Sequence, residues 1–155
     1  MEEVGSKIIR LRCLRAIYER QVVREDAPAY LDGRRYTAPA QVYELFRDLS
    51  KEAKEHFLCL HLDGKNRIVC LDRVSVGSMN QSIVHPREVF KTAILSSAAA
   101  VLLVHNHPTG CTEPSPEDKE VTLRLAEVGA LIGIRVLDHV IVGEGYYSFT
   151  EHGLL

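Results

Sequence analysis

The chain contains one long uninterrupted apolar run, Ala98–Val104 (AAAVLLV), which continues directly into His105-Asn106-His107-Pro108. An apolar run of this length, without polar alternation, predicts a central strand that is buried on both faces. Residues two apart on a strand point to the same face, so His105 and His107 should project together where the strand leaves the core. The run therefore predicts a sheet with a pair of imidazoles at its edge.

Helix-like and strand-like segments alternate on both sides of this run. Before it, we expect a helix over residues 39–51, a strand over 56–62, a hairpin turn at 63–66, a strand over 67–76 and a helix from 86 onward. After it, we expect a helix over about 115–133 and strands over 134–142 and 146–150. Helices and strands that alternate around one sheet indicate an α/β or mixed α+β fold.

The chain has 155 residues, of which 46% are apolar and 26% charged, as in a single globular domain. We expect residues 1–36 to form an N-terminal arm, with a strand or a helix followed by a loop, and residues 37–155 to form the domain. The first residues lack an apolar signal segment, and no apolar run is long enough to span a membrane. The four cysteines include no Cys-X-X-Cys pair. These features predict a reduced, cytoplasmic protein.

An acidic residue follows the two histidines at a suggestive spacing. Asp118 lies eleven residues beyond His107, near the start of the next predicted helix. Two histidines and one carboxylate leave a fourth tetrahedral position for water, which is typical of a catalytic zinc site. Ser115 and Asp118 would also suit the N-cap and third position of that helix, and capping alone would explain both residues. Because capping does not explain their spacing from His107, the metal interpretation is favoured.

The residues around this cluster resemble a known family. Residues 105–108 (HNHP), followed by Ser115 and Asp118, resemble the JAMM motif of JAB/MPN metalloproteases, H-x-H-x7-S-x2-D. Residues 84–90 (VHPREVF) and 137–139 (LDH) are similar to the RadC branch of that superfamily. The likeness covers about residues 38–151. It implies a curved mixed sheet flanked by helices, the JAB/MPN or cytidine deaminase-like architecture. It also implies a stand-alone form without the N-terminal helix-hairpin-helix region of longer RadC proteins.

The resemblance further implies a zinc-dependent hydrolase of peptide or isopeptide bonds, with no organic cofactor. Its metal ligands would be His105, His107 and Asp118. A general base upstream of the motif would be Glu55, at the entry to the strand over 56–62, in preference to Glu88 on the helix before the metal strand. Ser115 would donate a hydrogen bond to the developing oxyanion. The substrate would be a peptide or a protein, with ubiquitin-like proteins among the candidates, and the oligomeric state stays open.

A non-catalytic accessory protein of DNA repair or of mobile elements is the alternative, suggested by the family name alone. The formal net charge is −2, and residues 1–36 hold eight Lys and Arg against six Asp and Glu, so nucleic-acid binding has little support. Two further residues stay open. His139 could support a metal ligand from behind. Cys111 is either a plain loop thiol or a redox-sensitive group near the metal.

Overall fold

The computed structural model describes residues 8–31, 34–77 and 84–155. Its elements are, in chain order, α1 (Pro39–Phe46), the 3-10 helix η1 (Arg47–Lys51), β1 (Glu55–Leu62), β2 (Ile68–Gly77), α2 (Pro86–Leu95), β3 (Ala100–Asn106), α3 (Pro116–Ile132), β4 (Arg135–Gly143) and β5 (Gly145–Ser148). Each lies within two residues of a predicted element, except that the first predicted helix is divided into α1 and η1. The mixed α/β fold is confirmed.

The strands form one mixed sheet in the order β2-β1-β3-β4-β5. β1 pairs antiparallel with both β2 and β3, β3 pairs parallel with β4, and β4 pairs antiparallel with β5. A parallel pair needs a crossover connection, and α3 supplies it between β3 and β4. The loop that leaves the end of β3 and the start of α3 therefore meet at one edge of the sheet.

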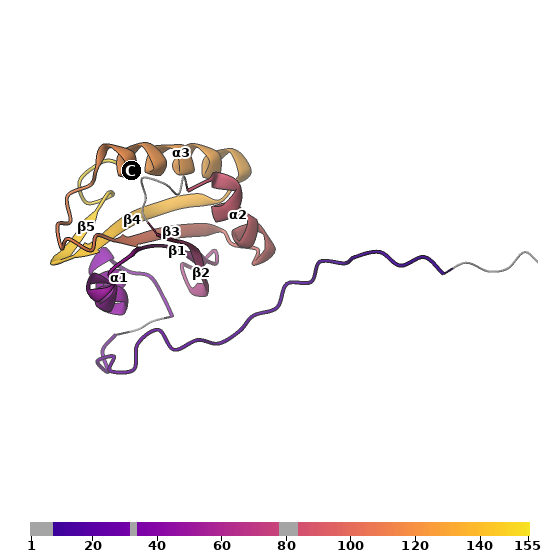
Figure 1. Ribbon diagram of the computed structural model, residues 1–155, viewed down its shortest axis with the longest axis horizontal. Coiled ribbons are helices and arrows are strands. Elements are labelled where there is room, and N and C mark those ends of the chain that lie inside the picture. Colours follow the sequence, from indigo (N-terminus) through magenta and orange to yellow (C-terminus); the bar gives the residue numbers. More distant parts are fainter. Residues whose placement is uncertain (1–7, 32–33, 78–83) are drawn as a thin grey trace, which may run out of the picture.

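Helices cover both faces of the sheet (Figure 1). Side chains of α2 and α3 pack on one face with Val101 and Leu103 of β3. Side chains of α1 pack on the other face with Leu102 and Val104 of the same strand. Every residue of β3 is buried, as the apolar run predicts, and the strand extends through His105 and Asn106. The core strand thus carries its polar end directly to the rim of the sheet.

α3 is 17 residues long and turns a continuous stripe of residues inward, namely Asp118, Thr122, Leu125 and Gly129. Gly129 permits close packing, since a Cβ atom there would lie 2.4 Å from the carbonyl oxygen of Ile134 at the start of β4. No helix among the described residues is long and apolar enough to cross a membrane. The close approach of α3 to β4 brings the two polar members of its stripe over the end of the sheet.

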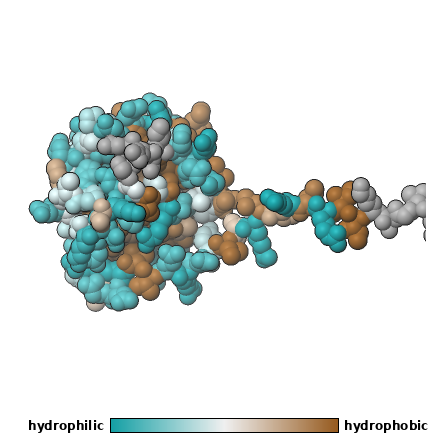
Figure 2. All heavy atoms as spheres, viewed as in Figure 1, coloured by the Kyte–Doolittle hydropathy of each residue, from teal (hydrophilic) through white to brown (hydrophobic). Residues whose placement is uncertain are grey.

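Residues 8–31 contain neither a strand nor a helix, so neither alternative predicted for the N-terminal arm is present in its described part. Apolar side chains project from this segment (Figure 2). Arg24 attaches the segment to the domain, because its guanidinium donates to the backbone carbonyl of Glu44 on α1 and lies 3.3 Å from the Glu44 carboxylate. The segment before Arg24 contributes nothing to the core described above.

Candidate metal centre

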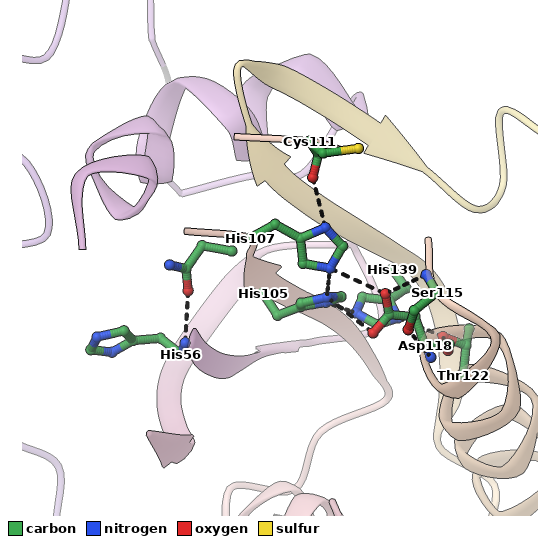
Figure 3. A network of polar contacts seen from close by, with 9 residues as sticks. His56, His105, His107, Cys111, Ser115, Asp118, Thr122 and His139 are labelled. Atoms are coloured by element: carbon green, nitrogen blue, oxygen red, sulfur yellow. Dashed lines mark hydrogen bonds and ion pairs between the residues drawn. The ribbon is translucent and has the colours of Figure 1, made fainter. Parts of the chain in front are cut away.

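The three predicted metal ligands meet at the end of β3 (Figure 3). The Nε2 atoms of His105 and His107 lie 3.0 Å apart. Asp118 places one carboxylate oxygen 3.1 Å from His107 Nε2 and the other 3.3 Å from His105 Nε2. His105 is fully buried, whereas the His107 side chain is 14% exposed. The cluster is therefore closed on the His105 side and reaches solvent beside His107.

Local structure fixes the direction of each ligand. His107 lies one residue beyond β3, and its backbone N–H still donates to Val142 of β4 at 3.0 Å. Asp118 belongs to a capping box, in which its N–H donates to Ser115 Oγ at 3.0 Å and its carboxylate accepts from the Ser115 N–H at 2.8 Å. The capping and metal interpretations of Ser115 and Asp118 are thus compatible, since the cap holds the carboxylate toward the histidines.

The Asp118 carboxylate and the His107 imidazole stabilise each other's charged forms. The hydrogen bond with Asp118 raises the pKa of His107, and the bond to the Cys111 carbonyl adds to this effect against burial. Burial alone would raise the pKa of Asp118, but hydrogen bonds with His105 and His107 outweigh it and hold that pKa well below its usual range. A permanent negative charge therefore lies between two ring nitrogens, an arrangement that attracts a cation.

The tautomer of His107 is set by the loop that follows it. Its Nδ1 lies 2.7 Å from the backbone carbonyl of Cys111, and a carbonyl only accepts, so Nδ1 carries the proton. In the neutral ring, Nε2 then offers its lone pair to the cluster. Cys111 acts through its backbone, and its thiol points away from His107 (Figure 3). No contact among the described residues gives that thiol a role at the site.

A series of buried hydrogen bonds lies behind His105. His105 Nδ1 lies 2.7 Å from Nε2 of His139, and His139 Nδ1 lies 2.6 Å from the hydroxyl of Thr122. That hydroxyl also donates to the backbone carbonyl of Asp118 at 2.5 Å. Complete burial lowers the pKa of His139 well below its usual value, so the ring is neutral at pH 7. His139 thus supports a predicted ligand from behind.

The donor set fits a zinc ion. Two imidazole nitrogens and a carboxylate oxygen are ordinary zinc ligands, and tetrahedral bonds of about 2.0–2.1 Å separate neighbouring ligand atoms by roughly 3.3 Å. The two histidine nitrogens lie 3.0 Å apart, each is 3.1 or 3.3 Å from a different oxygen of Asp118, and one ligand atom from each residue can be chosen so that all three lie within 4.8 Å of one another. His105, His107 and Asp118 could therefore hold such an ion if the Asp118 carboxylate turned one oxygen toward both nitrogens.

Glu55 is the first residue of β1, the strand that pairs with β3, and this is the position predicted for the general base. Phe57 of β1 lies directly opposite His105 of β3, and cross-strand partners share a face of the sheet. Continuing this antiparallel register by two residues brings Glu55 level with His107. Its negative charge contributes to the raised pKa of His107. Glu88 is instead exposed on α2 and paired with Lys91 at 2.7 Å.

Asn106, between the two histidines, points to the other face of the sheet and is fully buried. Its side-chain oxygen accepts from the His56 N–H at 2.7 Å, and its amide donates to the carbonyls of Lys54 and Leu49 at 3.0 and 2.9 Å. These bonds hold the peptide groups on both sides of Glu55. The Asn106 side chain thus fixes the backbone at the start of β1 relative to β3.

We expect Asn106→Ala to lower the free energy of unfolding by about 2–4 kcal/mol, because three backbone groups lose their partner in a partly buried setting. Denaturant unfolding measures this loss. Asn106→Asp is the companion variant. It keeps the acceptor for the His56 N–H but places a carboxylate against two carbonyls, so it should destabilise the fold at least as much. A loss below 0.5 kcal/mol for Asn106→Ala (about the scatter of ordinary surface changes) would contradict this role.

Comparison with known proteins identifies the family. Residues 36–154 match the RadC-like JAB domain. The chain belongs to the RadC-like JAB domain family. The predicted resemblance is thereby confirmed, and the metal cluster lies wholly within the matched residues.

Several UPF0758 proteins are similar to this member of the family. The UPF0758 protein of Trichlorobacter lovleyi is 58% identical over 123 residues, which are 78% of this chain and 54% of the relative. That of Geotalea uraniireducens is 48% identical over 153 residues, 97% of this chain and 67% of the relative. That of Methanosarcina mazei is 48% identical over 124 residues, 79% and 54% of the two chains. The chain thus spans little more than half the length of most of these relatives, and their names state no activity.

Two residues at the site were missed by the sequence analysis. Asn106 was quoted only as part of the motif, because its partners lie about 50 residues earlier in the chain. Thr122 went unnoticed although a signal exists. It lies four residues after Asp118 and therefore on the same face of the helix, where the other inward residues further along α3 are Leu125 and Gly129. A polar residue on a buried stripe one turn beyond a ligand is a reasonable candidate for a supporting contact.

Proposed function

We propose that this chain is a zinc-dependent hydrolase that cleaves amide bonds in peptides or in isopeptide-linked proteins. The supporting observation is the convergence of His105, His107 and Asp118 at one rim of the sheet, with the acidic Glu55 level with His107 on the neighbouring strand. Ligands, negative charge and a candidate base are the parts that metal-assisted hydrolysis requires.

The metal and the protein would divide the chemistry between them. When bound, zinc supplies a Lewis acid and lowers the pKa of a water ligand to about 7. The Glu55 carboxylate accepts the proton of the attacking water and returns it to the leaving amine. The ligands themselves stay fixed, because His107 is held by the Cys111 carbonyl and Asp118 by the capping box.

Ser115 would stabilise the oxyanion. Its Oγ accepts from the Asp118 N–H, and no donated bond from this hydroxyl is found among the described residues. Its proton is therefore available to the oxygen of the scissile carbonyl. Because the cluster meets solvent beside the partly exposed His107, the substrate would approach from that side.

Metal content and amide cleavage together test this function. We expect the purified chain to hold one zinc ion, to cleave amide-linked fluorogenic peptides or isopeptide-linked lysine conjugates, and to lose cleavage when the metal is removed by a chelator. His107→Ala should lose both metal and cleavage. His152→Ala, which changes an exposed histidine far along the chain, should keep both.

Two results would contradict the proposal. One is a wild-type protein that binds no stoichiometric zinc. The other is cleavage that persists in the chelated protein or in His107→Ala. Salt-sensitive DNA binding that survives His107→Ala, without any cleavage, would favour the accessory role instead.

A further inference from the structure

The tautomer of His105 is set differently from that of His107. The partner of His107 Nδ1 is a backbone carbonyl, which can only accept, so this nitrogen must carry the proton. For His105 the partner is Nε2 of His139, and a neutral imidazole nitrogen is either a donor or an acceptor. Whether His105 offers a lone pair or a proton to the metal position therefore depends on which nitrogen of His139 is protonated.

Thr122, at the far end of this series of hydrogen bonds, decides which nitrogen of His139 is protonated. Thr122 Oγ lies 2.5 Å from the carbonyl oxygen of Asp118, and a carbonyl only accepts, so the hydroxyl donates there. With its single proton used, the oxygen can only accept from His139 Nδ1, 2.6 Å away. Nδ1 of His139 then carries the ring proton, and its Nε2 accepts from His105 Nδ1 at 2.7 Å.

We propose that Thr122 and His139 are positioning residues that hold His105 in the Nδ1–H tautomer, so that its Nε2 lone pair faces the metal site. The contacts are directional at every step, from the Asp118 carbonyl through Thr122 and His139 to His105. Asp118 thus acts twice, once through its carboxylate as a ligand and once through its backbone as the end of this chain. The inference uses the metal centre of the proposed function but does not depend on hydrolysis.

Within the part of the chain that the structure describes, the His139 ring nitrogens have no other hydrogen-bond partner. Thr122, His139 and His105 each have no solvent exposure. Phe149 stacks on the His139 ring, with centroids 4.9 Å apart and planes at 14°, and Phe57 meets its edge at 5.5 Å. The packed ring keeps its orientation, so a lost partner on one side can be answered only by a shift of the proton between its nitrogens.

Thr122→Val and Thr122→Ser form a matched pair of variants that test the hydrogen bonds from Thr122 through His139 to His105. Valine keeps the shape of threonine but leaves His139 Nδ1 without an acceptor. The other tautomer of His139 then becomes favourable, and it drives the His105 proton onto Nε2, where the metal would bind. We expect Thr122→Val to weaken zinc binding about 10- to 100-fold, as for other groups that orient metal ligands. Thr122→Ser keeps the hydroxyl and should bind within about threefold of wild type.

Two measurements are needed. Competition with a chromophoric chelator gives the zinc affinity. Nitrogen-15 NMR of histidine-labelled, metal-free protein at neutral pH shows which nitrogen of His105 and His139 carries the proton. We expect both rings to be protonated on Nδ1 in the wild type, and Thr122→Val to move the protons toward Nε2. A His105 without a proton on Nδ1 in the wild type, or unchanged zinc affinity in Thr122→Val, overturns the inference.

Two variants of His139 distinguish an effect on the His105 tautomer from a purely structural effect. The side-chain oxygen of His139→Gln can still accept from His105, whereas His139→Leu cannot, so only the glutamine variant should recover zinc affinity. Equal loss in both variants, with both folded, overturns the inference. A wild-type protein that binds no zinc refutes the proposed function, while the NMR readout on metal-free protein still decides the tautomer of His105.

Discussion

Glu55→Gln is expected to lower amide hydrolysis by about 10²- to 10⁴-fold, the usual contribution of a general base. The amide is isosteric but cannot take a proton from water. Zinc content should stay at the wild-type level, because the ligand atoms belong to His105, His107 and Asp118. Steady-state kinetics and metal analysis of the same preparation separate the two effects.

Glu88→Gln is the matched control for this experiment. Hydrogen bonding to Lys91 lowers the pKa of Glu88, so this residue is a poor base near neutral pH as well as an exposed one. Its substitution should leave the rate within about twofold of wild type. Undiminished hydrolysis in Glu55→Gln, or a large loss in Glu88→Gln, would show that the base has been misassigned.

Asp118→Asn is expected to reduce zinc affinity by more than about 100-fold, since loss of a ligand should exceed the 10- to 100-fold effect of losing an outer contact. The substitution removes the only charged ligand but keeps an oxygen that can accept from the Ser115 N–H. The helix start should therefore survive, and thermal unfolding of the metal-free protein should change little. Zinc titration against a competing chelator measures the loss.

Ser115→Ala provides the opposite combination. It removes the acceptor of the Asp118 N–H, which should cost about 1 kcal/mol of stability. The Asp118 carboxylate remains, so zinc should still bind. If Ser115→Ala lost the metal as completely as Asp118→Asn, the cap rather than the carboxylate charge would be the dominant feature of this segment.

The fold could be predicted because its signals are local. The apolar run before His105 has the length of a strand and no polar alternation, and Ser115-Pro116 is a local signal for a helix start. The clustering of His105, His107 and Asp118 could be predicted for the same reason, since the three residues lie within fourteen residues of one another. Residues that are close in sequence therefore determine most of the geometry of the candidate metal cluster.

The supporting contacts could not be predicted because they depend on pairings between distant segments. Nothing in residues 49–56 shows that they will lie beside Asn106, since that follows only from the antiparallel pairing of β1 with β3. The bond from His139 to Thr122 likewise requires α3 to lie over β4 at a set depth, which Gly129 allows. The N-terminal arm is a different case, since residues 8–31 carry strand-like and helix-like patterns yet adopt neither structure.

The order of these parts along the chain has an evolutionary consequence. The candidate metal cluster of two histidines and one aspartate lies with Thr122 and His139 in residues 105–139, from the end of β3 through α3 into β4, whereas Glu55 belongs to the earlier strand β1. Under the proposed function, metal binding and catalysis are thus under separate mutational control. A descendant could lose catalysis by one substitution at residue 55 and persist as a metal-loaded pseudoenzyme, so an intact HNH segment alone is an incomplete guide to activity among such proteins.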